Sequence, residues 1–217
     1  MDYATARLNM VESQLRTNRI VDPALIAAFE QLPRERFVPE SRRGFAYVDE
    51  DLPIGGGRYL MEPMVLARLI QAAAVEPGDS VLDVAGTGGY GTAILARLAA
   101  SVVLLEPDGA LAQAAEATLD RLQVDNAVVV TGDPAEGYAR QAPYEAIVVE
   151  AALAEVPAAL LDQLAEGGRL VAPLLEQPGL CRGVLLRKDR GTVSQRMLFD
   201  CSTPVLPGFE RKAGFVF

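Results

Sequence analysis

The chain has 217 residues, is 50% hydrophobic and 23% charged, and carries 20 Lys and Arg against 29 Asp and Glu, a net charge of −9. This is the composition of a soluble globular protein, and the absence of histidine excludes imidazole-based catalysis, including Ser-His-Asp triads, Cys-His pairs and HExxH zinc sites. A pI of about 4.6 argues against a general nucleic-acid binder, although it leaves a local basic patch open.

The first third of the chain predicts helices followed by a loop. Apolar positions on one face predict a helix over residues 3–17. A second helix opens at Asp22-Pro23, where an N-cap residue precedes a proline, and ends before Pro33. From there to Gly57, clustered arginines, an acidic run and three glycines predict a loop with little regular structure.

The middle of the chain predicts a parallel sheet. A helix begins at Pro63 and ends near Pro77, and runs rich in Val, Ile and Leu then alternate with helical stretches. The expected strands are residues 80–85, 101–106, 126–132, 144–151 and 168–175, and the expected helices are residues 91–100, 108–123 and 157–166. Near-continuous apolar strands with helices between them are typical of a parallel sheet that is covered on both faces.

The end of the chain predicts a different arrangement. Residues 181–188 and 192–199, joined by a turn, predict an antiparallel hairpin, and residues 214–217 form a last apolar stretch. The fold class is therefore α/β, with a mostly parallel sheet of seven strands, a C-terminal antiparallel hairpin and N-terminal helices.

The two cysteines, Cys181 and Cys201, lack the spacing of a CxxC motif or a metal site, so we interpret them as ordinary thiols in a reducing cytoplasm. We find no N-terminal signal pattern and no apolar run near the ~18 residues that would span a bilayer. We expect a cytoplasmic protein without a metal, a membrane or a nucleic-acid partner.

Glycines and acids follow the first three expected strands. The turn DVAGTGGYG covers residues 83–91, and such a turn lets a ligand approach the backbone at the carboxyl ends of parallel strands. Glu106 ends the second strand, where its carboxylate can accept both hydroxyls of a ribose. Asp133 follows the third strand, where an adenine edge can be read. Together these positions predict a ligand that contains adenosine.

Two adenosine cofactors compete for this site. Gly86-x-Gly88-x-x-Gly91 spells the dinucleotide fingerprint, so an NAD-binding oxidoreductase is an alternative. However, Glu106 follows the glycines more closely than the roughly 20 residues expected, and a hairpin stands where a second nucleotide-binding half is needed. An acid at Asp83 suits the ammonium group of S-adenosylmethionine, which we therefore favour.

Several segments resemble the protein-L-isoaspartate O-methyltransferases. They include DLPIGGGRYLMEP (51–63) and VLDVAGTGGYG (81–91), together with residues 10–40 and 132–174. The resemblance implies a Rossmann-like class I methyltransferase that uses S-adenosyl-L-methionine to methylate the free carboxylate of isoaspartyl residues in damaged proteins. It implies one methyltransferase domain over residues 1–217, with N-terminal helices and a substrate loop in 1–60 and a cofactor-binding core in 61–217. The implied cofactor-binding residues are Asp83, Ala85, Gly86, Thr87, Gly89, Glu106, Asp133 and Pro134.

The segment that corresponds to the family's active site departs from its GHGQTISQP pattern. Here residues 55–63 read GGGRYLMEP, so Tyr59 and Met61 replace the threonine and serine, and Glu62 replaces the glutamine before the proline. We predict Arg58, Tyr59 and Met61 as the catalytic residues, with Arg58 or Tyr59 holding the acceptor carboxylate. A relative that methylates another acceptor and a non-catalytic interaction module of the same fold remain alternatives.

Overall fold

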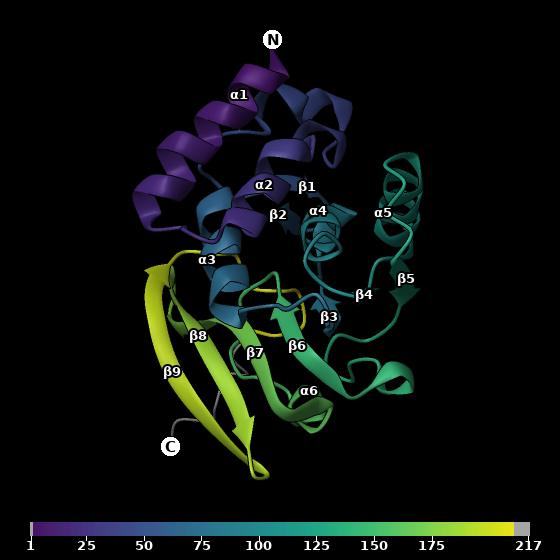
Figure 1. The fold of residues 1–217 in the computed structure, drawn as a ribbon, viewed down its shortest axis with the longest axis vertical. Coiled ribbons are helices and arrows are strands. Elements are labelled where there is room, and N and C mark those ends of the chain that lie inside the picture. Colours follow the sequence, from purple (N-terminus) through teal and green to yellow (C-terminus); the bar gives the residue numbers. More distant parts are fainter. Residues whose placement is uncertain (1, 211–217) are drawn as a thin grey trace, which may run out of the picture.

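The computed structural model describes residues 2–210, in which seven strands form one sheet in the order β5-β4-β3-β6-β7-β8-β9 (Figure 1). The strands β5, β4, β3, β6 and β7 run parallel, and β8 and β9 are antiparallel to their neighbours. Their bounds are β3 (Ser80–Val84), β4 (Ser101–Glu106), β5 (Ala127–Thr131), β6 (Tyr144–Val149), β7 (Leu164–Gln177), β8 (Leu180–Asp189) and β9 (Thr192–Cys201). The predicted sheet and hairpin are confirmed; the apolar stretch 214–217 lies outside the described residues.

The helices begin where the sequence places capping residues. Asp2, Asp22 and Asp108 each accept hydrogen bonds from backbone N–H groups in the first turn of a helix, which satisfies donors that the helix itself leaves unpaired. The α-helices are α1 (Tyr3–Met10), α2 (Pro23–Gln31), α3 (Pro63–Ala73), α4 (Tyr90–Leu95), α5 (Gly109–Arg121) and α6 (Ala158–Asp162).

Some helices are shorter than predicted. The helix expected over residues 3–17 is α-helical to Met10 and then continues as a π-turn, Val11–Leu15, and a 3-10 turn. The helix α6 ends at Asp162 because β7 already begins at Leu164 and pairs with β6. Helical periodicity does not mark the end of α6, since pairing in the sheet decides it.

A β-hairpin replaces part of the predicted loop. Strand β1 (Leu52–Gly55) pairs antiparallel with β2 (Arg58–Leu60), and two 3-10 turns, Arg34–Arg36 and Glu40–Phe45, precede them. Gly55, Gly56 and Gly57 form the tip with φ of 115°, 59° and 71°, values that L side chains rarely adopt. Strands of four and three residues are too short for an alternating pattern to be recognised. This hairpin lies above the carboxyl ends of the parallel strands (Figure 1).

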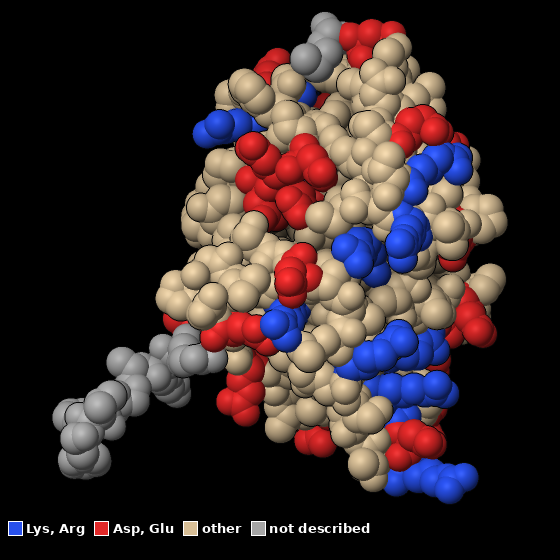
Figure 2. Space-filling model, turned by 90° about the vertical axis from the view of Figure 1, so that its left-hand side faces the viewer, with Lys and Arg blue, Asp and Glu red and all other residues tan. Residues whose placement is uncertain are grey.

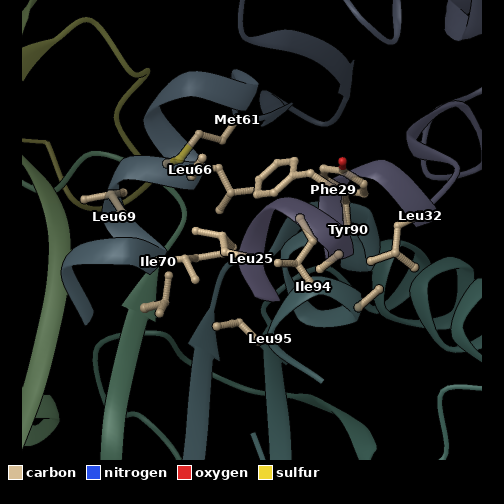
Figure 3. Packing of buried hydrophobic residues seen from close by; sticks show 14 of the residues in the cluster. Leu25, Phe29, Leu32, Met61, Leu66, Leu69, Ile70, Tyr90, Ile94 and Leu95 are labelled. Atoms are coloured by element: carbon tan, nitrogen blue, oxygen red, sulfur yellow. The ribbon is translucent and has the colours of Figure 1, made fainter. Parts of the chain in front are cut away.

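Alternate residues of the parallel strands bury both faces of the sheet. Val81, Val102 and Val148 face the larger core, which they share with α2, α3 and α4, whereas Leu82 and Val103 face the core that includes α6. Figure 3 shows the larger core, in which side chains from α2, α3 and α4 interlock. The sheet is thus fixed from both sides, and the ends of its strands are held in place.

Within residues 2–210, no helix combines the length and the apolar character that a membrane crossing requires.

The net charge of −9 is unevenly spread: on the face drawn in Figure 2, basic side chains form a band and acidic ones gather in separate groups. Arg19, Arg68 and Arg196 line one hollow of about 270 Å³, in which the Arg68 guanidinium lies 4.0 Å from the centre of the Phe199 ring. A local basic patch therefore exists on an acidic protein.

Candidate active site

The glycine-rich turn lies where the order of the sheet reverses. Strand β3 has β4 on one side and β6 on the other, so the chain segments that leave these three strands diverge at its carboxyl end. In parallel sheets of this kind, ligands bind at such a point. Three acids stand there: Asp83 in β3, Glu106 at the end of β4, and Glu150 just after β6.

Arg58, from β2, is inserted between the ends of β3 and β4. Its Nη1 donates to Glu106 Oε1 at 2.5 Å and its Nη2 to Glu106 Oε2 at 3.1 Å. The same Nη2 donates to Thr87 Oγ1 at 2.7 Å and to the Ala85 carbonyl oxygen at 3.1 Å. Arg58 is 4% exposed and Glu106 0%. Paired hydrogen bonds of this geometry are among the strongest that a guanidinium makes.

A backbone group also donates to Glu106. The N–H of Asp108 donates to Oε1 at 3.0 Å, in addition to the two hydrogen bonds from Arg58. Burial raises the pKa of Glu106, and the Arg58 cation opposes that rise. The carboxylate predicted to bind a ribose is therefore engaged by a side chain of the same protein.

Asp83 and Glu150 form a buried pair of carboxyl groups. Thr92 Oγ1 donates to Asp83 Oδ2 at 2.6 Å, whereas Asp83 Oδ1 and both carboxyl oxygens of Glu150 have no hydrogen-bond partner in the described part of the chain. Burial raises the pKa of Asp83 to about 7, and burial together with the nearby Asp83 raises the pKa of Glu150 well above its usual range. Burial and mutual repulsion therefore favour the protonated form of Glu150.

The glycines of the turn give these acids their space. A Cβ on Gly86 would collide with the Asp83 carboxylate, and one on Gly91 would collide with Glu150. Gly88 and Gly89 have φ of 78° and 83°, and Ala85 has φ of 59°, which is unusual for a residue with a side chain. In this structure Gly86 and Gly91 thus accommodate the protein's own carboxyl groups.

The adenine side of the predicted site is more open. Asp133 is exposed at the end of β5, where its Oδ1 accepts a hydrogen bond from Ala135 N at 2.8 Å, and Pro134 is buried beside it. Both line a hollow of about 490 Å³ with Pro107 and Pro207. The structure therefore places Asp133 and Pro134 together, and Pro207 lines both this hollow and the small cavity at Arg58.

The predicted catalytic residues do not all face the same space. Tyr59 is 36% exposed and lines, with Arg58, the small cavity beneath the hairpin. Met61 is 1% exposed and lies in the larger core near Leu66 and Phe29 (Figure 3), and its carbonyl oxygen accepts a hydrogen bond from Arg34 at 2.7 Å. The structure thus places Met61 apart from the other two predicted residues, because its side chain points into the core.

A cluster of acids borders the hairpin. Burial and the neighbouring Asp51 and Asp49 raise the pKa of Glu62 to about 7, and burial raises the pKa of Asp51 to about 6. Asp51 Oδ1 accepts a hydrogen bond from Glu62 N at 3.0 Å, and Asp51 also lines the cavity beneath the hairpin. The mouth of the site therefore becomes more negative as the pH rises through neutrality.

The residues fit an adenosine cofactor in kind, but the space between them is closed. The acids at the ends of β4 and β5 and the glycine-rich turn are the groups that such a ligand requires. The cavity between Arg58, Thr87, Glu150 and the 203–207 segment measures only about 10 Å³. This is room for roughly one water molecule, whereas pockets for small ligands measure about 300–1,000 Å³.

The sequence pattern did not identify two polar residues of this region as site residues. Thr92 lies in the helix expected over residues 91–100, and its hydroxyl donates to Asp83 Oδ2. Glu150 lies near the end of the strand expected over residues 144–151, and an acid at the end of an apolar strand is the signal that also marks Glu106.

The parallel part of the sheet bears on the choice of cofactor. After β7 the described sheet ends with the antiparallel strands β8 and β9, so a full second nucleotide-binding half does not form. The topology disfavours the oxidoreductase alternative.

Comparison with known proteins agrees with this topology. Residues 6–202 match the protein-L-isoaspartate(D-aspartate) O-methyltransferase (PCMT) family. A protein-L-isoaspartate O-methyltransferase of Koribacter versatilis is 42% identical over 200 residues, which cover 92% of this chain and 89% of the relative. A relative of the same name from Methanoculleus marisnigri is 43% identical over 205 residues, covering 94% of this chain and 92% of its own.

Solved structures show the same fold. One protein-L-isoaspartate O-methyltransferase superposes with a TM-score of 0.80 at 25% identity over 92% of this chain, which spans 65% of that longer protein. A Plasmodium falciparum protein described as a beta-aspartate methyltransferase (PCMT), in complex with S-adenosyl-L-homocysteine, superposes with a TM-score of 0.76 at 23% identity over 95% of this chain and 98% of its own. From its sequence match, its sheet and its strand-end acids, the chain belongs to the protein-L-isoaspartate(D-aspartate) O-methyltransferase family.

Proposed function

We propose that this protein transfers a methyl group from S-adenosyl-L-methionine to the free carboxylate of isoaspartyl residues in other proteins, a reaction that begins the repair of such damage. The observation that supports this most directly is the pair of acids, Glu106 and Asp133, at the ends of neighbouring strands beside a glycine-rich turn. They occupy this position in a chain that matches the PCMT family over residues 6–202.

The chemistry makes modest demands on the protein. S-adenosyl-L-methionine supplies an activated methyl group on a sulfonium, and the acceptor carboxylate is already ionised at neutral pH. The protein must therefore orient the acceptor and exclude water, which does not require histidine. This is consistent with a sequence that contains none.

Each proposed residue has a role that follows from its place. Glu106 would accept the ribose hydroxyls and Asp133 would read the adenine edge, while the backbone of the 85–89 turn would lie against the cofactor. On the hairpin, Arg58 and Tyr59 are the proposed contacts of the acceptor carboxylate, because a guanidinium and a phenol both donate hydrogen bonds. We place the reaction in the cytoplasm, which agrees with the free thiols of Cys181 and Cys201.

Methyl transfer to a matched pair of peptides tests the proposal. Purified protein is incubated with methyl-labelled S-adenosylmethionine and a peptide that carries either an isoaspartyl or a normal aspartyl residue at one position. We expect base-labile label on the isoaspartyl peptide alone, since a methyl ester hydrolyses readily. Equal labelling of both peptides would point to another acceptor, and no labelling of either, with S-adenosylhomocysteine bound, would contradict the proposed acceptor.

A further inference from the structure

The strongest unexplained feature of the molecule is the position of Arg58. Its guanidinium is buried and makes four hydrogen bonds, to Glu106, Thr87 and the Ala85 carbonyl group. Two of these bonds occupy both oxygens of Glu106, the carboxylate that we assign to the ribose hydroxyls of the cofactor. Arg58 and a ribose cannot both hold this carboxylate in the same way.

The space around Arg58 supports the same conclusion. The cavity at this point has a volume of about 10 Å³ and is lined by Arg58 itself, together with Thr87, Glu150 and the 203–207 segment. By contrast, the hollow beside Asp133 measures about 490 Å³. The adenine side of the predicted site is open, and the side that would receive the ribose is filled by the guanidinium.

The hairpin that carries Arg58 is separate from the main sheet and is anchored at its base. In the described part of the chain, β1 and β2 pair with each other and not with the seven-stranded sheet. The tip consists of the exposed Gly55, Gly56 and Gly57, whereas Leu52 and Leu60 hold the base of the hairpin in the larger core. Movement of the tip and of the Arg58 side chain would therefore break the contacts of the guanidinium without disturbing a strand of the main sheet.

We propose that Arg58 is a latch on the cofactor site: it binds Glu106 in place of the ribose hydroxyls, so cofactor binding requires Arg58 to withdraw. The proposal rests on the proposed function, because it assumes that Glu106 receives the ribose. Part of the binding free energy of the cofactor is used to displace Arg58. The apparent affinity for the cofactor is therefore the intrinsic affinity multiplied by the fraction of molecules in which Arg58 has already withdrawn. Arg58 thereby sets the concentration of cofactor at which half of the enzyme molecules have cofactor bound.

Calorimetric titration with S-adenosylhomocysteine tests the latch without relying on activity. Arg58→Gln keeps a polar side chain of similar length but removes the charge that holds Glu106. We expect this variant to bind S-adenosylhomocysteine at least about tenfold more tightly than the wild-type protein. The gain should disappear in the double variant Arg58→Gln/Glu106→Gln, because the ribose contact is then also weakened.

Two further variants complete the experiment. Arg58→Lys keeps the charge but loses the paired geometry, and we expect an affinity between those of the wild type and Arg58→Gln. It also carries the test if Arg58→Gln does not fold, which thermal unfolding will show. Arg196→Ala, an exposed arginine on β9, is the matched control and should bind as the wild type does.

The outcomes separate the latch from the proposed function. Equal binding by the wild type, Arg58→Gln and Arg58→Lys would overturn the latch and leave the methyltransferase proposal intact. If none of the folded variants binds S-adenosylhomocysteine at millimolar concentration, the proposed function is overturned together with the latch, and the result favours a non-catalytic module of the same fold.

Discussion

Glu150 and Asp83 share one buried site at the adjoining ends of β6 and β3, and neither carboxyl oxygen of Glu150 has a hydrogen-bond partner among the described residues. Burial and the closeness of the two groups favour protonation, because two buried carboxylates near each other repel. A protonated acid is thus favoured at the point where the order of the sheet reverses.

This pair makes the folded state sensitive to alkaline pH. Both acids have a raised pKa, to about 7 for Asp83, so the folded protein binds more protons than the unfolded chain above about pH 4. The free energy of unfolding should therefore fall as the pH rises through neutrality. Glu150→Gln, which removes the titrating group but keeps a side chain of the same size, should reduce the loss between pH 5 and pH 8 by about 1 kcal/mol or more.

Urea denaturation at the two pH values measures this effect. Glu155→Gln, at an exposed position after the same strand, is the control and should leave the pH dependence unchanged. A pH dependence that is the same in Glu150→Gln and in the wild type would show that the pair does not retain its proton.

Arg34 should be important for stability. It is fully buried, its Nε donates to the Ala46 carbonyl oxygen and its Nη2 to that of Met61, both at 2.7 Å, and it lies 4.9 Å from the centre of the Tyr90 ring. Arg34→Met should lower the free energy of unfolding by about 2–4 kcal/mol, because two buried carbonyl groups lose their donor.

The exposed Arg36 provides the comparison for this measurement. Arg36→Met should change the unfolding free energy by less than about 0.5 kcal/mol. A loss as large as that of Arg34→Met would mean that charge, and not the two hydrogen bonds, accounts for the effect.

Glu62 should make catalysis weaken as the pH rises. Its pKa is about 7, so it becomes an anion close to the hairpin just above neutral pH, near the place where we expect an anionic acceptor. We predict that kcat/KM for the isoaspartyl peptide falls several-fold between pH 6.5 and pH 8.5, and that Glu62→Gln largely removes this fall. Assays at constant ionic strength should measure both proteins. An identical decline in the two would assign the titration to another group.

Asp133 should contribute to cofactor affinity independently of the latch. Asp133→Asn can still accept the hydrogen bond from Ala135 N but loses the negative charge, so the local turn is preserved. We expect S-adenosylhomocysteine to bind about 1–2 kcal/mol more weakly, in the wild-type and in the Arg58→Gln background alike. Asp125→Asn, at an exposed position before the same strand, should have no effect. Unchanged affinity in Asp133→Asn would mean that the adenine edge is not read there.

The sheet could be predicted from the sequence because its signals are local and repeated. The runs 80–85, 101–106 and 144–151 are apolar over nearly their whole length, and each lies on a described strand. Glu106 and Asp133 could be found by the same reasoning, since an acid that closes or follows such a strand must lie at its carboxyl end.

The contacts of Arg58 could not be predicted in this way. Arg58 and Glu106 are 48 residues apart, and β1 and β2 are too short to show a pattern. The direction of the Arg58 side chain depends on where the glycine tip folds back, which is a tertiary property. Met61 shows the same limit: its position in the family motif suggested a site residue, but the turn into α3 directs its side chain into the core.

Strands β8 and β9 place Cys181 directly opposite Cys201, with the Cys181 thiol buried and donating to the Thr203 carbonyl oxygen. Opposed residues on antiparallel strands lie at Cα separations that a disulfide can bridge, whereas a shift of one residue turns side chains to the opposite face. A mild oxidant added to the folded protein would therefore cross-link the two thiols where the last two strands have paired in register. The two thiols serve as an internal marker of correct assembly at the edge of the sheet.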